Sequence, residues 1–260
     1  MADRSGTSPN HDVELWRRPR WHALAVVLLA YAMPAGAASA DGAAGAAGPR
    51  AGKTRNVAIV LFDGVELLDF AGPGEVFASA ASLGRSAGRD AFDVYTVAVS
   101  AKPLLSQGFV RIVPQYSLAD SPRPDILIIP GGDVGPLLGS PEFMRWLRSS
   151  AAGAEVTMSV CTGAFVLAQA GLLDGLDATT YYGAIAALRA EAPKARVHAD
   201  RRLIDNGRVL TTAGVSAGID GALHLVSRLL GREAAERTAR YMEYRWIPEP
   251  GPTATAAPGR

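Results

Sequence analysis

The sequence predicts an α/β fold of three layers, in which helices cover both faces of a mostly parallel sheet. Two observations support this prediction. Short, continuous apolar runs such as residues 56–62 alternate with helix-like segments, as in sheets whose strands are buried on both faces. Cys161 lies where one apolar run meets a helix. In open sheets of this kind, ligands bind at the carboxyl ends of the strands.

The composition is that of an ordinary globular protein and excludes several classes of function. Of the 260 residues, 48% are hydrophobic, and the formal net charge of +1 gives no basic excess for binding nucleic acid. A single cysteine excludes an intramolecular disulfide and a zinc site built from several cysteines. The four histidines are dispersed without metal-ligand spacing. We therefore expect no metal and no cofactor.

The first 40 residues have the pattern of a secretory signal peptide. Arginines from Arg17 to Arg20 precede an apolar run that begins at Trp21, and small residues follow up to Ala40. The sequence predicts cleavage after Ala40 and export, to the periplasm in our interpretation. The apolar run is short for a membrane span, so we expect no stable membrane insertion once the signal is removed. An uncleaved anchor, or an over-long start on a cytoplasmic protein, are the alternatives.

Composition divides the rest of the chain into three parts. Residues 41–55 are rich in Ala and Gly and are predicted to be a flexible linker. Residues 56–247 have the length of one domain with a full core. Residues 248–260 are rich in Pro, Ala and Thr and are predicted to be a disordered tail.

In the first half of the domain, turn and cap residues separate the predicted elements. Gly72-Pro73 marks the start of a helix, because Pro is tolerated in a first turn. Gly108 is the pivot of a hairpin-like excursion, and Ser140 is the N-cap of a helix with Pro at its first position. The predicted strands are 56–62, 92–100 and 125–130.

The second half of the domain contains the junction that carries Cys161. Residues 155–160 are a buried strand and residues 162–170 an apolar helix. Further on, we predict helices at 182–190, 217–230 and 232–246, a strand pair formed by 196–198 and 201–204, and a last strand at 208–214.

Cys161 on this junction fits a nucleophile elbow, a tight turn that exposes a nucleophile above the sheet edge. Ser159 and Gly163 supply the small neighbours that the close approach of strand and helix requires. Helix amides directed at the sulfur favour a thiolate, whereas an ionised carboxylate nearby opposes it. We expect Cys161 to react with iodoacetamide well below pH 8. The alternative is an inert cysteine buried in the core.

Three segments that carry polar or flexible residues follow three of the predicted strands. Asp69 follows the first strand, Gly131 and Gly132 follow the third, and Cys161 follows the fourth. Because the carboxyl ends of parallel strands meet at one edge, we expect these residues to converge on one pocket for a small-molecule substrate.

Five ordered blocks of sequence carry a resemblance to a known family. The blocks are VELLDFAGPGEVF, DILIIPGGD, SVCTGAFVLAQAGLLDG, ATT and TTAGVSAGIDGALHLV, with MEYRWIP closing the domain. On these blocks the chain resembles the ThiJ/PfpI superfamily, whose domains have the class I glutamine amidotransferase-like, flavodoxin-like fold, and within it the isonitrile (isocyanide) hydratase branch. The sensor domains of AraC-type regulators share the blocks. Those regulators carry a DNA-binding region after the domain, for which we expect no room here.

The resemblance implies roles for individual residues. It makes Cys161 the nucleophile, Asp69 its acidic partner and Thr162 the residue that follows the nucleophile in the hydratase branch. Backbone amides of Gly132 and Thr162, with Gly131 beside them, are implied as donors to developing negative charge. The implied reaction adds water to an isocyanide and gives an N-substituted formamide. A homodimer is implied as well.

One position departs from the family pattern. The block that usually reads Thr-Thr-His-Trp is Thr-Thr-Tyr-Tyr here, so Tyr181 stands where a histidine is usual and is assigned to substrate binding. Three functions remain open: an isonitrile hydratase, another chemistry of the superfamily (glyoxalase, deglycase or amidase-type hydrolysis), and a non-catalytic sensor of a small ligand. His198 and Asp200 resemble the His-x-acid pair of a glutaminase, but we interpret them as part of a strand–turn–strand segment.

Overall fold

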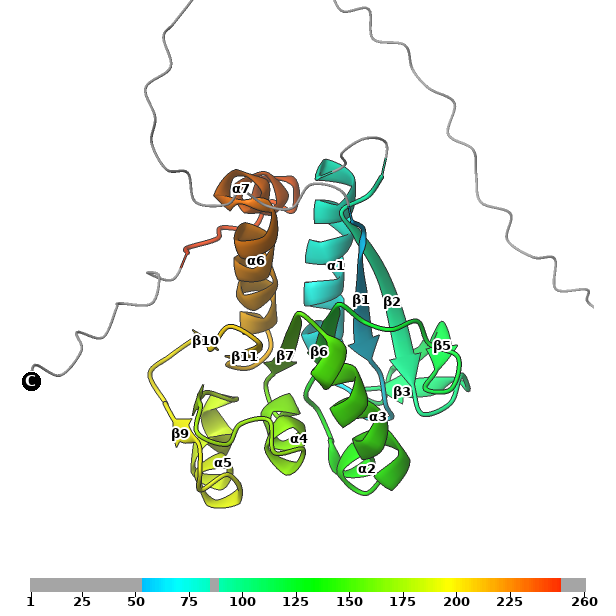
Figure 1. The fold of residues 1–260 in the computed structure, drawn as a ribbon, viewed down its shortest axis with the longest axis vertical. Coiled ribbons are helices and arrows are strands. Elements are labelled where there is room, and N and C mark those ends of the chain that lie inside the picture. Colours follow the sequence, from blue (N-terminus) through cyan, green and yellow to red (C-terminus); the bar gives the residue numbers. More distant parts are fainter. Residues whose placement is uncertain (1–52, 85–88, 249–260) are drawn as a thin grey trace, which may run out of the picture. The chain divides into compact units, whose positions relative to one another are not determined.

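A computed structural model describes residues 53–84 and 89–248 of the chain (Figure 1). Contacts divide the chain into residues 1–46 and 47–260, and the described residues all belong to the second unit. The predicted signal peptide, all of the predicted linker but residues 53–55, and all of the predicted tail but Pro248 lie outside the described residues.

A seven-stranded sheet forms the centre of the described domain, in the order β10-β11-β7-β6-β1-β2-β5. Every neighbouring pair is parallel except β10 and β11, which confirms the predicted mostly parallel sheet. All residues of β6 and β7 are buried; β6 is a continuous apolar run, and β7 combines apolar residues with Thr157 and Ser159. The strands are β1 (Arg55–Val60), β2 (Phe92–Ala98), β5 (Tyr116–Ser117), β6 (Ile126–Ile129), β7 (Val156–Val160), β10 (Leu203–Asp205) and β11 (Val209–Thr212).

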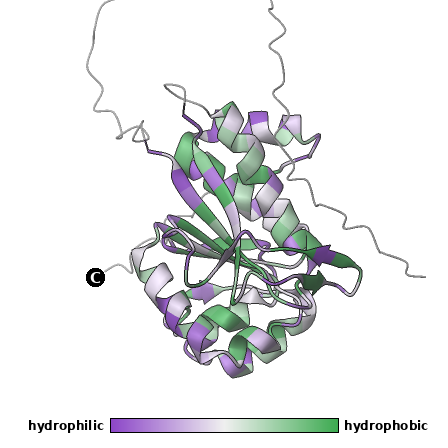
Figure 2. Ribbon diagram, turned by 90° about the vertical axis from the view of Figure 1, so that its right-hand side faces the viewer, coloured by the Kyte–Doolittle hydropathy of each residue, from purple (hydrophilic) through white to green (hydrophobic). Residues whose placement is uncertain are grey.

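Helices cover both faces of the sheet, and alternate residues of the strands divide the core between them. Ile126 and Ile128 pack toward one helix layer, whereas Leu127 and Ile129 pack toward the other. Figure 2 shows the hydrophobic strands between helices whose outer sides are more hydrophilic. One layer is α1 (Leu67–Leu83), α6 (Ala217–Leu230) and α7 (Arg232–Tyr241); the other is α2 (Gly135–Leu138), α3 (Pro141–Gly153), α4 (Gly163–Gln169), the 3₁₀ turn η1 (Tyr182–Ala184) and α5 (Ile185–Glu191).

Two small sheets lie outside the central one. The predicted hairpin is confirmed as β3 (Leu104–Ser106) paired with β4 (Val110–Ile112) around Gly108, whose φ is 76°. The predicted pairing of 196–198 with 201–204 is wrong. Instead β9 (Arg196–Val197) pairs with β8 (Asp177–Ala178), and β10 pairs with β11. The Asp205-Asn206-Gly207 turn joins β10 directly to β11, so β10 pairs with β11 and not with β9.

Helix α1 begins at Leu67, five residues before the predicted start at Gly72-Pro73. The chain is fixed just before the helix, because Val65 forms a bridge with Gly132 and the Glu66 amide donates to the Gly131 carbonyl. Pro73 therefore lies inside the helix. The final helix, α7, also ends earlier than predicted, at Tyr241. The early start of α1 places Asp69 in its first turn, on a rigid element.

The order of the strands locates the edge at which a ligand is expected. From β1 the chain moves to β2 on one side, and later returns to place β6 and β7 on the other side of β1. The strand order thus reverses between β1 and β6. In open α/β sheets the crevice at such a switch point, outside the carboxyl ends of the strands, is where ligands bind.

Candidate active site

Cys161 lies on a strained turn between β7 and α4, as the nucleophile elbow predicts. Its φ is 56°, a left-handed conformation that is uncommon for a residue with a side chain. Two hydrogen bonds hold the turn: the Cys161 amide donates to the Ala213 carbonyl at 3.1 Å, and the Thr180 hydroxyl donates to the Cys161 carbonyl at 2.7 Å. The side chain is nearly covered, with 7% of the residue exposed.

Gly163 makes the turn possible, because α4 passes very close to the end of β6. A Cβ at this position would lie 2.1 Å from the Ile129 carbonyl oxygen and 2.9 Å from that of Pro130. We expect Gly163→Ala to destabilise the protein by about 3 kcal/mol or more, because backbone atoms must move to admit the methyl group. Urea denaturation measures this. Gly153→Ala is the matched control, since a Cβ there meets nothing within 4 Å; equal stability of the two variants would contradict the prediction.

Asp69 approaches Cys161 from the first turn of α1 and is fully buried. Its Oδ2 accepts a hydrogen bond from the Gly131 amide at 2.9 Å, whereas Oδ1 has no hydrogen-bond partner among the described residues. Burial raises the pKa of Asp69 to about 7; the charge of Glu66 also raises it, and the Gly131 amide, the Val215 amide and the Cys161 thiol lower it. A carboxyl with this pKa holds and releases a proton near neutral pH.

The thiol itself is not the low-pKa thiolate that the sequence led us to expect. Burial, followed by the negative charge of Asp69, raises the pKa of Cys161 to about 12, and the Thr162 amide only partly offsets this. Helix α4 has seven residues, so its dipole is a weak counterweight. The resting pair is therefore a protonated thiol beside a carboxyl that titrates near neutrality.

We expect alkylation of Cys161 by iodoacetamide to be slow at pH 7 and to rise steadily beyond pH 9, since only the thiolate reacts. In Asp69→Asn the raising effect of the carboxylate charge on the thiol pKa is lost, so the labelling curve shifts to lower pH. Mass spectrometry measures both curves, and every adduct reports on the only cysteine. A wild-type midpoint below pH 8 would contradict the raised pKa.

The donor loop after β6 reaches the site, but its amides are already engaged. The Gly131 amide binds Asp69, and the Gly132 amide donates to the Thr162 hydroxyl at 3.0 Å. The same hydroxyl is 2.9 Å from the Gly132 carbonyl, to which it donates. The Gly132 amide is therefore occupied in this conformation, and the role implied for it as a donor to developing negative charge stays a prediction. Thr162 remains, with its amide acting on the Cys161 sulfur.

Tyr181 lies beside Cys161, and its substrate-binding role stays a prediction. A Cβ on Gly214 would fall 2.7 Å from Tyr181 Cδ2 and 3.4 Å from Cys161 Sγ. The Tyr181 ring and the Cys161 sulfur therefore both lie next to Gly214. Sequence reasoning missed Gly214 and its neighbour Val215, whose φ is 54°. β11 is parallel to β7, so the loop that follows β11 ends at the same edge of the sheet as the other site segments. The same reasoning could therefore have found Gly214 and Val215.

Both histidines of the described residues are engaged away from this site. His198 Nε2 lies 2.7 Å from Asp177 Oδ1, and Arg196 pairs with the same carboxylate at 2.6 Å. His224 Nε2 lies 2.8 Å from Asp205. His198 thus pairs with Asp177 rather than with Asp200 or the thiol, which agrees with our reading of it as part of a structural segment.

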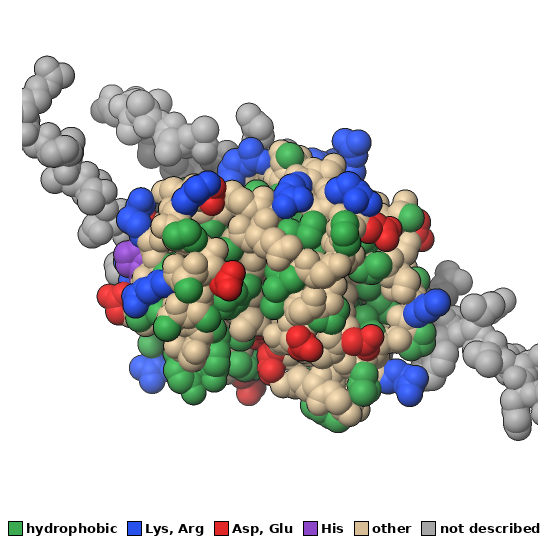
Figure 3. All heavy atoms as spheres, turned by 90° about the horizontal axis from the view of Figure 1, so that it is seen from below, with side chains coloured by type: hydrophobic (Ala, Val, Ile, Leu, Met, Phe, Trp, Pro, Cys, Tyr) green, Lys and Arg blue, Asp and Glu red, His purple; other side chains and the backbone are tan. Residues whose placement is uncertain are grey.

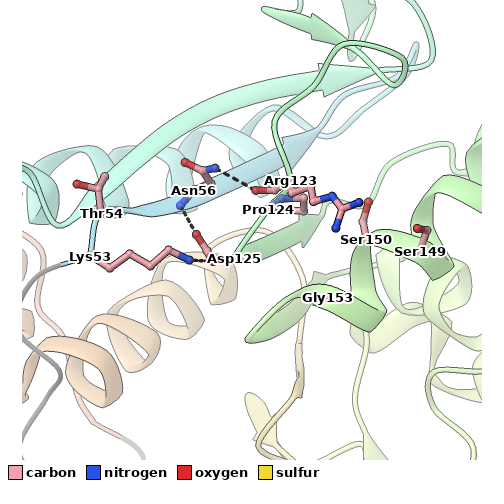
Figure 4. A pocket seen from close by; sticks show the side chains of 9 residues that line it. All are labelled: Lys53, Thr54, Asn56, Arg123, Pro124, Asp125, Ser149, Ser150 and Gly153. Carbon is pink, nitrogen blue, oxygen red and sulfur yellow. Dashed lines mark hydrogen bonds and ion pairs between the residues drawn. The ribbon is translucent and has the colours of Figure 1, made fainter.

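Two cavities in the described domain lie apart from Cys161. One, of about 320 Å³, is next to the hairpin of β3 and β4. The other, of about 440 Å³, lies at the amino ends of β1 and β6 and is lined mainly by polar residues (Figure 4). In the second cavity Asp125 is bound by Lys53 at 2.6 Å and by the Asn56 amide at 2.9 Å, so its charge is compensated. Neither cavity is lined by Asp69 or Cys161; the candidate active site is defined by its side-chain chemistry instead.

Within residues 53–84 and 89–248, no group of three or more His, Cys, Asp and Glu side chains is placed to hold a metal ion. In the same part of the chain, no helix has the length and apolarity needed to cross a membrane.

Comparison with known proteins assigns the chain to a family. Residues 55–228 match the DJ-1/PfpI family. The chain is 35% identical over 192 residues to an isonitrile hydratase from Pseudomonas putida, covering 72% of this chain and 78% of that protein. It is 27% identical over 199 residues to the transcriptional regulator GbdR of Pseudomonas aeruginosa, of whose length it spans 53%. The fold resembles a THiJ/PfpI family protein from Pseudomonas syringae, with a TM-score of 0.65, 29% identity and coverage of 78% of this chain and 80% of that one. The chain therefore belongs to the DJ-1/PfpI family.

Proposed function

We propose that this protein is a cysteine-dependent enzyme that adds water to an isocyanide to give an N-substituted formamide. The observation that carries the proposal is a fully buried carboxyl, Asp69, near enough to the strained Cys161 to raise the pKa of its thiol, while both described histidines are engaged elsewhere. The 35% identity to an isonitrile hydratase supports the same assignment.

In the first step the sulfur adds to the terminal carbon of the isocyanide. Asp69, as the carboxylate, accepts the thiol proton while the C–S bond forms, and then delivers this proton to the same carbon. The product is a thioimidate, Cys–S–CH=N–R, in which the S–H bond has been added across one carbon. A raised thiol pKa suits this order of events, because the thiol needs a base beside it.

In the second step water replaces the sulfur. Asp69 takes a proton from water as the oxygen adds to the carbon, and the nitrogen is protonated. The C–S bond then breaks, the thiol recovers its proton, and R–NH–CHO leaves. One water is consumed overall. A pKa of about 7 allows Asp69 to act as base and as acid in turn.

The decisive test is a spectrophotometric or chromatographic assay for formamide production from a panel of alkyl and aryl isocyanides. We expect turnover by the wild type and none by Cys161→Ala. A pure wild-type protein that is inert toward the whole panel would remove the proposal. Consumption of methylglyoxal without isocyanide turnover would favour another chemistry, of the glyoxalase, deglycase or amidase type.

A second candidate is a non-catalytic sensor of a small ligand, favoured by the similarity to a transcriptional regulator and by Tyr181 in the usual place of a histidine. It predicts a ligand that raises the melting temperature equally in the wild type and in Cys161→Ser. Cysteine-dependent turnover would exclude this function.

We also propose that the protein is exported and that it forms a homodimer. Export rests on the basic, apolar and small-residue pattern of residues 1–40, and N-terminal sequencing of the secreted protein is expected to begin at Asp41. Light scattering coupled to gel filtration tests the dimer; a monomer at micromolar concentration would contradict it.

A further inference from the structure

Hydrogen bonds from Thr179 and Thr180 hold the segment before Tyr181 against the Cys161 turn and the neighbouring chain. The Thr179 amide donates to the Thr211 hydroxyl at 2.9 Å, and the Thr179 hydroxyl is 3.0 Å from each of two carbonyls, those of His198 and Arg201. The Thr180 hydroxyl donates to the carbonyl of Cys161 itself. Tyr181 is thus held in a fixed position beside the sulfur.

Tyr182 extends this aromatic surface outward. The two rings lie with centroids 4.5 Å apart at an angle of 54°. Tyr181 is half-buried against the core, whereas Tyr182 is 80% exposed. The pair of rings therefore extends from beside the buried Cys161 sulfur to the solvent.

Other large apolar side chains are exposed next to the site residues in the chain. Leu68, which precedes Asp69, is 36% exposed, and Val215, which follows Gly214, is 37% exposed. Figure 3 views the molecule from the end toward which β1 and β2 run in Figure 1, and hydrophobic side chains reach the surface there among carboxylates.

We propose that Tyr181 and Tyr182 form an aromatic subsite that binds a planar, apolar substituent on the electrophile attacked by Cys161. For the proposed reaction this makes aryl and arylmethyl isocyanides the preferred substrates. The inference rests on the proposed function in that Cys161 is the nucleophile. Stacking of one ring on the pair is expected to favour an aromatic over a methyl substituent by about tenfold.

A thiol-labelling experiment tests the subsite without requiring turnover. Benzyl and methyl methanethiosulfonate each convert the thiol to a mixed disulfide and release methanesulfinic acid, and Cys161 is the only cysteine that can react. The quantity measured is the ratio of the second-order rate constants, benzyl over methyl, relative to the same ratio for free cysteine. We expect this relative ratio to be about ten for the wild type and for Tyr182→Phe, and to fall toward one in Tyr182→Ala.

Tyr241→Ala is the matched control, because Tyr241 is a similarly exposed tyrosine (66%) at the end of α7; it should keep the wild-type ratio. An unchanged ratio in Tyr182→Ala, or an equal loss in Tyr182→Phe, would overturn the stacking subsite. If the ratio behaves as expected but no isocyanide is hydrated, the subsite stands and the proposed reaction fails. If isocyanides are hydrated with no preference for aryl groups and the labelling ratio is near one, the reaction stands and the subsite fails.

Discussion

Cys161→Ser is expected to lower kcat/KM for isocyanide hydration by about a thousandfold or more, because a hydroxyl is a far weaker nucleophile than a sulfur activated by the same carboxyl. Formamide production measures the effect. Two hydrogen bonds shape the turn, from the Cys161 amide to the Ala213 carbonyl and from the Thr180 hydroxyl to the Cys161 carbonyl. Neither involves the sulfur, so the fold should survive the substitution.

The melting temperature of Cys161→Ser provides the control for this prediction. A variant that melts close to the wild type but has lost turnover supports nucleophilic catalysis. A correctly folded variant with near wild-type turnover would show that the sulfur does not form a covalent intermediate. Asp69 would then have to act on water without the cysteine.

Asp69→Asn is expected to have two effects, the first of them on catalysis. Asn cannot carry protons, so kcat/KM should fall by about a hundredfold to ten-thousandfold. Because the carboxylate is the form that accepts the thiol proton, wild-type kcat/KM should rise with pH through about 7, the pKa of Asp69. Stopped assays from pH 5 to 9 measure the profile, and this limb should be absent from the residual activity of Asp69→Asn.

The second effect is on stability and has the opposite sign. Burial raises the pKa of Asp69 from 3.8 to about 7, so the unfolded chain releases this proton first as the pH rises. The ionisation therefore lowers the free energy of unfolding progressively between about pH 4 and pH 7, by about 4 kcal/mol at most once both states are ionised. Asp69→Asn removes this loss, so its stability relative to the wild type should be greater at pH 8 than at pH 5.

Urea denaturation at the two pH values measures this difference. Asp177→Asn is a useful comparison, because the hydrogen bond from Arg196 and the one with His198 lower the pKa of Asp177 to about 2. Removing that carboxylate should weaken the protein at pH 8 rather than strengthen it. The prediction would be contradicted if the difference in free energy of unfolding between Asp69→Asn and the wild type were the same at pH 8 as at pH 5. That result would mean that ionising the buried Asp69 carboxyl does not destabilise the fold.

The architecture could be predicted from the sequence because its strongest signals are local. The buried strand β6 is an unbroken apolar run, and the Ser140 hydroxyl does cap α3, accepting from the Phe143 amide. The convergence of Asp69, Gly131 and Cys161 also followed, because parallel strands bring their carboxyl ends to one edge whatever the detailed packing.

What the sequence could not supply depends on tertiary contacts. Pro73 suggested a helix start, but the bridge between Val65 and Gly132 fixes the chain just before Leu67, so α1 begins there. The acidity of Cys161 was misjudged because a helix terminus is visible in sequence, whereas the burial that outweighs it is not. The occupied amide of Gly132 likewise follows from the Thr162 hydroxyl, a partner thirty positions away.

The left-handed backbone at Cys161 has a practical consequence for crystallography. Glycine adopts this conformation without penalty, and the bonds from Ala213 and Thr180 involve only main-chain atoms of residue 161. Cys161→Gly should therefore keep the shape of the turn, and melt slightly higher, while opening the space of the missing side chain. Crystals of this variant would be a trap in which an unreacted isocyanide can be soaked and its orientation against Asp69 and Tyr181 observed.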